Sequence, residues 1–199
     1  MKSILIATKN PGKVREFQYL MSKYNVKVTS LLDIDYKDDI VEDAETFSEN
    51  ALIKARQIAK EYKTMVVADD SGLEIDALDG RPGVYSARYA GDARDDLANM
   101  NKVLTELEGV SEAERTARFV CAVAVVDEWG TSHVVTGTCE GLIVNEPIGT
   151  EGFGYDPIFY LPERKKTMAQ IPKSEKNVLS HRAKAFGQLE GILNDFFTK

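Results

Sequence analysis

The stretch SILIATKNPGKVREF, residues 3–17, joins an apolar run to a segment with helical spacing. Residues 3–7 predict a buried strand. Residues 13–23 predict a helix, because their apolar side chains recur every three or four positions. A strand that leads through a short polar loop into a helix is the opening unit of an α/β fold.

Lys13 lies at the joint between this strand and this helix, where a helix N-terminus favours an anion such as phosphate. A solvated lysine in the first turn is the plainer interpretation. The joint is not a Walker A loop, because that motif needs Gly where Ala7 stands and Ser or Thr where Val14 stands. If a metal ion is required, its ligands must therefore come from other segments.

Alternating strands and helices followed by a hairpin predict an α/β domain whose mixed sheet is covered by helices. The helix after residue 46 begins with capping-box spacing at Thr46 and Glu49. A Gly-, Pro- and Arg-rich segment, residues 80–91, predicts an ordered irregular loop. The other predicted elements are strands at residues 26–29, 65–68, 119–126, 133–139 and 142–144, and helices at residues 95–107 and 177–197.

Composition sets limits on the class of protein. The 199 residues, 43% of them hydrophobic, predict one compact domain, residues 1–199, that buries roughly 70% of its unfolded surface. Cys121 and Cys139 fall in apolar strands and suit core packing in a reducing cytoplasm better than a disulfide or a zinc site. No secretory signal or membrane span is expected. The net charge of -7 argues against general binding to nucleic acid or anionic membranes.

Asp69 and Asp70 follow the predicted strand at residues 65–68 and are expected at its end. Two adjacent carboxylates repel one another unless a cation or hydrogen-bond donors compensate them. Magnesium prefers such oxygen ligands, and Glu42 or Glu45 in the acidic segment, residues 33–49, would supply a second one. A solvated turn is an equally good interpretation of the spacing.

Two later segments carry further candidate residues. FGYDP, residues 153–157, predicts either a glycine turn with aromatic core anchors or a platform on which a base stacks. In the last predicted helix, Lys176, His181 and Arg182 lie off the apolar stripe and offer donors suited to a carbonyl or a phosphate.

Five motifs together closely resemble the inosine triphosphate pyrophosphatases, also called dITP/XTP or non-canonical purine NTP pyrophosphatases. They are TKNPGK, ENALIKA, ADDSGLEIDALDGRPGVYSARYAG, GFGYDPIF and KNVLSHRAKA, at residues 8–13, 49–55, 68–91, 152–159 and 176–185. The resemblance implies hydrolysis of ITP, dITP and XTP to the monophosphate and pyrophosphate, which cleanses the nucleotide pool. It also implies an elongated mixed sheet flanked by helices, two lobes around an active-site cleft, a cytoplasmic homodimer and Mg²⁺ as cofactor.

The resemblance also assigns roles to individual residues. Asp70 would be the proton acceptor and also a metal ligand, together with Glu42. Lys9 is a departure from the family pattern, because many members have His or Gly at this position. The triphosphate cradle would be Thr8, Lys9, Asn10, Pro11, Gly12 and Lys13. The other substrate contacts would be Ser71, Phe153, Gly154, Tyr155, Asp156, Lys176, His181 and Arg182.

Three alternatives stay open at this point. A Maf-like pyrophosphatase would act on other modified nucleotides, which a substrate panel would reveal. A non-catalytic nucleotide sensor would bind without turnover, and a pyrophosphate-release assay would expose it. A nucleic acid binding module is the weakest alternative, because the net charge is -7 and no basic stripe is present.

Overall fold

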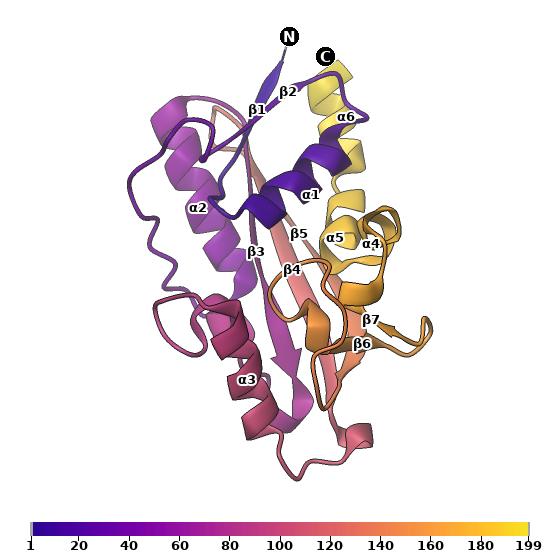
Figure 1. The fold of residues 1–199 in the computed structure, drawn as a ribbon. Coiled ribbons are helices and arrows are strands. Elements are labelled where there is room, and N and C mark those ends of the chain that lie inside the picture. Colours follow the sequence, from indigo (N-terminus) through magenta and orange to yellow (C-terminus); the bar gives the residue numbers. More distant parts are fainter. Residues whose placement is uncertain (1, 199) are drawn as a thin grey trace. The chain divides into compact units, whose positions relative to one another are not determined.

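The structure is a computed structural model that describes residues 2–198 (Figure 1). The strands are β1 (Ser3–Ile6), β2 (Lys27–Ser30), β3 (Val66–Ile75), β4 (Thr116–Val126), β5 (Ser132–Ile143), β6 (Phe159–Leu161) and β7 (Lys166–Thr167). The α-helices are α1 (Pro11–Met21), α2 (Phe47–Tyr62), α3 (Asp96–Glu106), α4 (Lys173–Leu179), α5 (His181–Gly187) and α6 (Glu190–Thr198).

The strands form one mixed sheet in the order β2-β1-β3-β4-β5-β6-β7. β1 pairs in parallel with β2 and with β3, and the helices α1 and α2 make the long connections that parallel strands require. β6 is antiparallel to β5 and to β7. The predicted α/β fold with a mixed sheet flanked by helices is thus confirmed.

The chain groups into two compact units, each with its own core. The first unit holds residues 2–70, 121–137 and 182–198, and the second holds residues 71–120 and 138–181. The core of the first unit includes Ile4, Phe17, Val67, Val123 and Phe186. The core of the second unit includes Leu73, Val103, Phe119, Phe159 and Met168. β3, β4 and β5 each contribute residues to both units.

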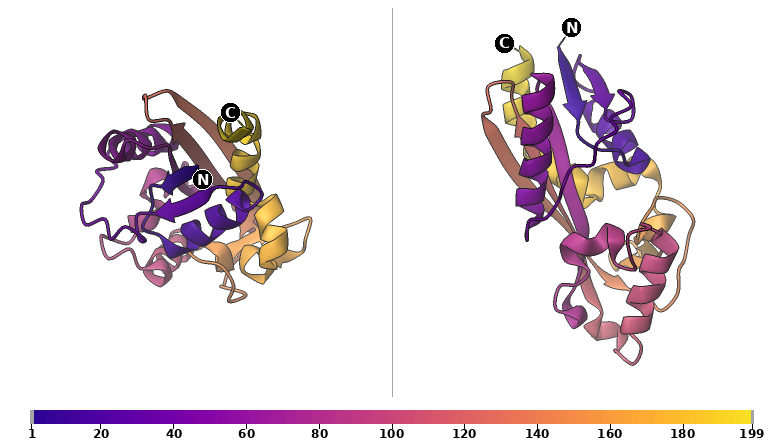
Figure 2. Two further views of the ribbon diagram at one scale, coloured as in Figure 1. Left: turned by 90° about the horizontal axis from the view of Figure 1, so that it is seen from above. Right: turned by 90° about the vertical axis from the view of Figure 1, so that its left-hand side faces the viewer.

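Within the first unit, helices cover both faces of the strands (Figure 2). α1, α5 and α6 lie on one face, where Phe17 and Phe186 pack edge to face with ring centroids 6.3 Å apart. α2 lies on the opposite face, and its buried side includes Ala51, Ala55 and Ile58. Each face of the strands therefore carries its own set of helical side chains.

The structure differs from the sequence prediction at two places that bear on the site. The strand predicted at residues 65–68 does not end there, because β3 continues to Ile75 and contains Asp69, Asp70 and Ser71. The single helix predicted at residues 177–197 is three helices, because Ser180 has an extended backbone between α4 and α5. The next interruption follows Gly187, a residue with low helix propensity. No helix within residues 2–198 is both long and apolar enough to cross a membrane.

Candidate active site

Asp69 and Asp70 point to opposite sides of β3, because successive side chains alternate along a strand. Asp69 continues the side of Val67, which packs in the core beneath α1 and α5. Asp70 lies on the other side, where it meets residues of α2. The repulsion expected between neighbouring carboxylates is thus relieved by the strand geometry, and each carboxylate has its own set of partners.

On the α2 side, the Lys54 ammonium joins two carboxylates. Its Nζ lies 2.8 Å from Glu42 Oε2 and 3.5 Å from Asp70 Oδ1. The Lys54 side chain is 8% exposed and that of Asp70 is 10% exposed. A cation and two carboxylates are therefore concentrated at one place that water reaches poorly.

Asn50, one helical turn before Lys54, connects Asp70 to the acidic segment. Its Nδ2 donates to Asp70 Oδ2 at 3.2 Å and to the Ala44 carbonyl at 3.3 Å. Its Oδ1 accepts from the Ala44 amide at 3.0 Å. The backbone near Glu42 is thereby tied to the same helix that positions Lys54.

Burial and neighbouring charges change the pKa values of Asp70 and Lys54. Burial raises the pKa of Asp70, and the nearby ammonium groups of Lys54 and Lys13 offset only part of that effect. Burial alone would lower the pKa of Lys54, but the charges of Asp70 and Glu42 outweigh it and raise that pKa. A carboxylate with a raised pKa is a better proton acceptor near neutral pH than an ordinary one.

On the opposite side of β3, Asp69 is the centre of a second ionic group. Its Oδ2 lies 2.9 Å from Lys13 Nζ and 3.0 Å from Arg182 Nη2. Arg182 also pairs with Glu16 on α1, and the Cys121 thiol lies 3.8 Å from Asp69 Oδ2. Burial alone would raise the pKa of Asp69, but Lys13 and Arg182 outweigh it and hold that pKa well below its usual range.

The N-terminus of α1 is capped from within the chain. Asn10 Oδ1 accepts from the backbone N–H groups of Gly12 and Lys13 at 2.8 and 3.1 Å. The expectation that free first-turn N–H groups favour an anion therefore needs correction at these two residues. Lys13 brings a positive charge to this first turn, and its ammonium pairs with Asp69.

The remaining residues of the loop at residues 8–13 take separate positions. Thr8 Oγ1 accepts from the Asn10 amide at 3.2 Å, and Pro11 begins α1. Lys9 Nζ donates to the Asp38 carbonyl at 2.7 Å and lies 5.6 Å from the centre of the Tyr36 ring. Lys9 thus links this loop to the acidic segment, a contact that the sequence did not predict.

In the second unit, Phe153, Asp156 and Lys176 form a compact group. Lys176 Nζ lies 2.6 Å from Asp156 Oδ2 and 4.8 Å from the centre of the Phe153 ring. The same Asp156 oxygen accepts from the Phe153 amide at 3.0 Å. The turn requires glycine at position 152, because a Cβ there would lie 2.0 Å from Asp156 Oδ2.

The rest of the FGYDP segment is held by polar contacts within the same unit. The Gly154 amide donates to Asp96 Oδ2 at 2.8 Å. The Tyr155 hydroxyl donates to the Ser86 carbonyl at 2.7 Å, and its ring lies in the core. Tyr155 is thus a core anchor, as the plainer interpretation of this segment predicts, whereas Phe153 is half-buried beneath Lys176.

The last predicted contact residues have different partners in the structure. The His181 ring stacks on Phe119 in the second unit with centroids 4.9 Å apart. Arg182, the next residue, is buried against Asp69 in the first unit. Ser71 lies within β3, directly after Asp70.

Lys54, Asn50 and Asp96 were missed by the sequence reasoning. For the first two a signal exists in ENALIKA, because residues 50 and 54 are one turn apart beside the buried positions of the helix. Polar side chains within an apolar stripe indicate a buried polar site. Asp96 carries no such signal, since an acidic residue in the first turn of a helix is common.

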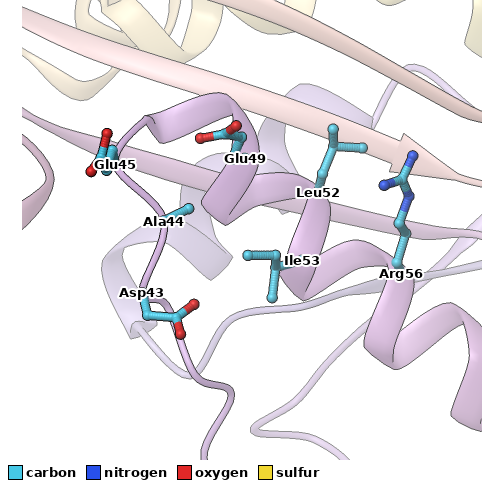
Figure 3. Close-up of a pocket in the computed structure, with 7 residues that line it drawn as sticks. All are labelled: Asp43, Ala44, Glu45, Glu49, Leu52, Ile53 and Arg56. Atoms are coloured by element: carbon cyan, nitrogen blue, oxygen red, sulfur yellow. The ribbon is translucent and has the colours of Figure 1, made fainter.

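A surface hollow is lined by residues of α2 and of the segment just before it (Figure 3). Glu45 and Glu49 line it, together with Asp43, Ala44, Leu52, Ile53 and Arg56. The structure therefore brings Glu42, and not Glu45, to Lys54 and Asp70.

The carboxylate oxygens of Glu42 and Asp70 are of the kind that a magnesium ion prefers as ligands. Both carboxylates already share one cation, the Lys54 ammonium. Among the described residues, no cluster of three or more His, Cys, Asp or Glu side chains is suited to hold a metal. Because Mg²⁺ is commonly held by one or two carboxylates plus substrate phosphates, two carboxylates are sufficient.

Comparisons with known proteins show which proteins this chain is similar to. Residues 4–192 match the model of the Ham1 family. The dITP/XTP pyrophosphatase of Geobacillus kaustophilus (strain HTA426) is 55% identical over 190 residues, covering 96% of this chain and 93% of that protein. The dITP/XTP pyrophosphatase of Bacillus subtilis (strain 168) is 51% identical over 193 residues, covering 97% and 98%.

Solved structures are also similar over nearly the whole length. The Ham1 protein of Staphylococcus aureus has a TM-score of 0.87 at 40% identity, covering 98% of this chain and 100% of that one. The HAM1 protein of Coxiella burnetii has a TM-score of 0.88 at 41% identity, with the same coverage. By sequence and by fold, this chain is a member of the Ham1 family.

Proposed function

We propose that this protein hydrolyses non-canonical purine nucleoside triphosphates, such as ITP, dITP and XTP, to the monophosphate and pyrophosphate. Two relatives that are more than half identical to it carry the name dITP/XTP pyrophosphatase. The observation that carries the proposal is the buried group in which Lys54 joins Glu42 to Asp70. This group combines a proton acceptor, Asp70, with carboxylates that can bind the metal ion of a metal–polyphosphate complex.

In the proposed reaction, Asp70 accepts a proton from a water molecule that attacks the α-phosphorus. A bond forms between the water oxygen and this phosphorus, and the bond to the bridging oxygen of pyrophosphate breaks in line. Lys13 binds the phosphates, and Thr8, Lys9, Asn10, Pro11 and Gly12 complete the cradle around them. Ser71, next to Asp70, is a further substrate contact.

Glu42 and Asp70 would hold Mg²⁺, which supplies positive charge that neutralises the triphosphate. Asn50 orients the Asp70 carboxylate by donating to Oδ2. Lys54 compensates the two carboxylates and limits their repulsion. Positioning and electrostatic compensation by these side chains provide most of the acceleration in such phosphoryl chemistry.

The base is recognised by residues of the second unit. Phe153 offers a ring face, and Lys176, held by Asp156, offers an N–H donor. A donor satisfies the 6-oxo group of hypoxanthine or xanthine but opposes the 6-amino group of adenine. Discrimination built on such a hydrogen bond reaches up to about 10⁴–10⁵. Gly154, Tyr155, His181 and Arg182 complete the proposed base contacts.

Location and assembly follow from the same family resemblance. The protein works as a homodimer in the cytoplasm and has no nucleic acid partner. Cys121 and Cys139 are buried and not joined in a disulfide, which suits a reducing compartment.

Pyrophosphate release from a nucleotide panel tests the proposal. We expect rapid release from dITP, ITP and XTP, slow release from ATP, and dependence on MgCl₂. Asp70→Asn serves as the control for contaminating activity. Preference for modified pyrimidines would favour a Maf-like enzyme, and binding of dITP without turnover would favour a nucleotide sensor.

A further inference from the structure

Asp69 is the most enclosed charged group of the first unit. Its side chain is 0% exposed, and one oxygen, Oδ2, meets both Lys13 Nζ at 2.9 Å and Arg182 Nη2 at 3.0 Å. These partners come from opposite ends of the chain, on α1 and α5. Asp69 is not the proton acceptor of the proposed reaction, and its side chain lies on the other side of β3 from that of Asp70.

Lys13 needs a fixed position if its ammonium is to bind phosphate efficiently. A lysine side chain has four rotatable bonds and loses much of its conformational entropy when it is immobilised. Among the described residues, the Asp69 carboxylate is the acceptor that pairs with the Lys13 ammonium. An ammonium has three N–H donors, so two of them are available for phosphate oxygens.

The Asp69 carboxylate is itself held in place. Arg182 approaches Oδ2 through both Nη2 and Nε, at 3.0 and 3.3 Å. The guanidinium is 1% exposed and also pairs with Glu16. An anchored carboxylate fixes a flexible lysine before substrate arrives, and such preorganisation increases affinity without adding a contact.

We infer that Asp69 is a positioning residue, which holds the Lys13 ammonium where it binds the triphosphate. The inference rests on the proposed pyrophosphatase function. It assigns Asp69 a role that is separate from that of its neighbour Asp70. It also predicts that substitutions of Asp69 and Lys13 affect the same step.

A double-mutant cycle on dITP hydrolysis tests this inference, with wild type, Lys13→Ala, Asp69→Asn and the double variant. We expect Asp69→Asn to lower kcat/KM by at least about fivefold, with the same division between KM and kcat as Lys13→Ala. In the Lys13→Ala background, the added effect of Asp69→Asn is expected to be less than about twofold. If the two effects multiply, Asp69 does not act through Lys13 and the inference is wrong.

Glu16→Gln is the matched control. Glu16 pairs with Arg182, as Asp69 does, but the Lys13 ammonium pairs with Asp69. The effects of Glu16→Gln and Lys13→Ala are therefore expected to multiply. Coupling to Lys13 that is confined to Asp69 supports the inference, whereas equal coupling for Glu16 points to a general disturbance of the core and overturns it.

Thermal unfolding separates folding from positioning. If Asp69→Asn does not fold, Asp69→Glu replaces it in the cycle with the same expected coupling to Lys13. If neither variant folds, Asp69 is a structural residue and the inference is overturned. Failure of the proposed function is distinct, because wild type itself would then release no pyrophosphate from dITP.

Discussion

Replacing Lys54 with methionine should expose how strongly its ammonium compensates the carboxylates around it. The substitution keeps a long, flexible side chain of similar volume in α2 but removes the positive charge. Glu42 and Asp70 then lose the cation that lies 2.8 and 3.5 Å from their oxygens. The Lys54 charge then no longer offsets the repulsion between the two carboxylates or the cost of burying them.

The magnitude follows from the burial of the three side chains. Removing one partner of a buried ion pair destabilises a protein by about 3–5 kcal/mol. The Glu42 side chain is 28% exposed and keeps part of its hydration, so the lower end applies, about 3 kcal/mol. For a chain of this length, about 3 kcal/mol corresponds to a fall in Tm of roughly 6–12 °C.

Thermal unfolding without divalent cations measures this fall. Lys60→Met is the matched control, because Lys60 lies exposed in the last turn of the same helix, and its loss should change stability by less than about 0.5 kcal/mol. Millimolar MgCl₂ should then raise the Tm of Lys54→Met more than that of wild type, since two carboxylates without a nearby ammonium bind a divalent cation better. Equal Tm values for the two variants would refute this account of the site.

Further outcomes are expected at the other groups. Asp70→Asn should remain folded but lose about 10²–10⁴ in kcat on dITP, as measured by pyrophosphate release, because the proton acceptor is removed. Lys176→Met should raise the KM for dITP while the inhibition constant of inorganic pyrophosphate, which has no base, stays unchanged; a parallel rise in both would place the residue at the phosphates. Native Cys121 and Cys139 should not react with a thiol reagent at pH 8, because both are buried. Burial also raises the pKa of Cys121 to about 12, and unfolding in denaturant should expose two thiols.

The sequence predicts the start of α2, because its signal is local: Thr46 lies three residues before Glu49 and accepts its backbone N–H as expected. The Asn10 cap of α1 was not predicted, since the first helix was expected to begin at residue 13 and begins at Pro11. The break at Ser180 has no such signal, since the apolar stripe continues on both sides of it. Periodicity reports which face is buried but not whether the helix is continuous.

The candidate site is less predictable, because its charges are compensated by residues that are distant in the sequence. From the sequence, Asp69 and Asp70 are expected at the end of a strand, because a carboxylate without a compensating cation must reach water. The strand continues because Lys13 and Arg182 compensate the first acid and Lys54 compensates the second. None of these pairings follows from spacing along the chain, so only the fold reveals them.

The alternation of side chains along β3 then determines what each acid can do. Asp69 faces a dense core, where two cations lower its pKa and keep it ionised, so it is a poor proton acceptor and a good anchor. Asp70 faces α2, where burial raises its pKa, and it is therefore suited to accept a proton. A strand directs these two adjacent aspartates to opposite sides, and their pKa values are therefore shifted in opposite directions. Substitutions of Asp69 and Asp70 should for this reason not have interchangeable effects.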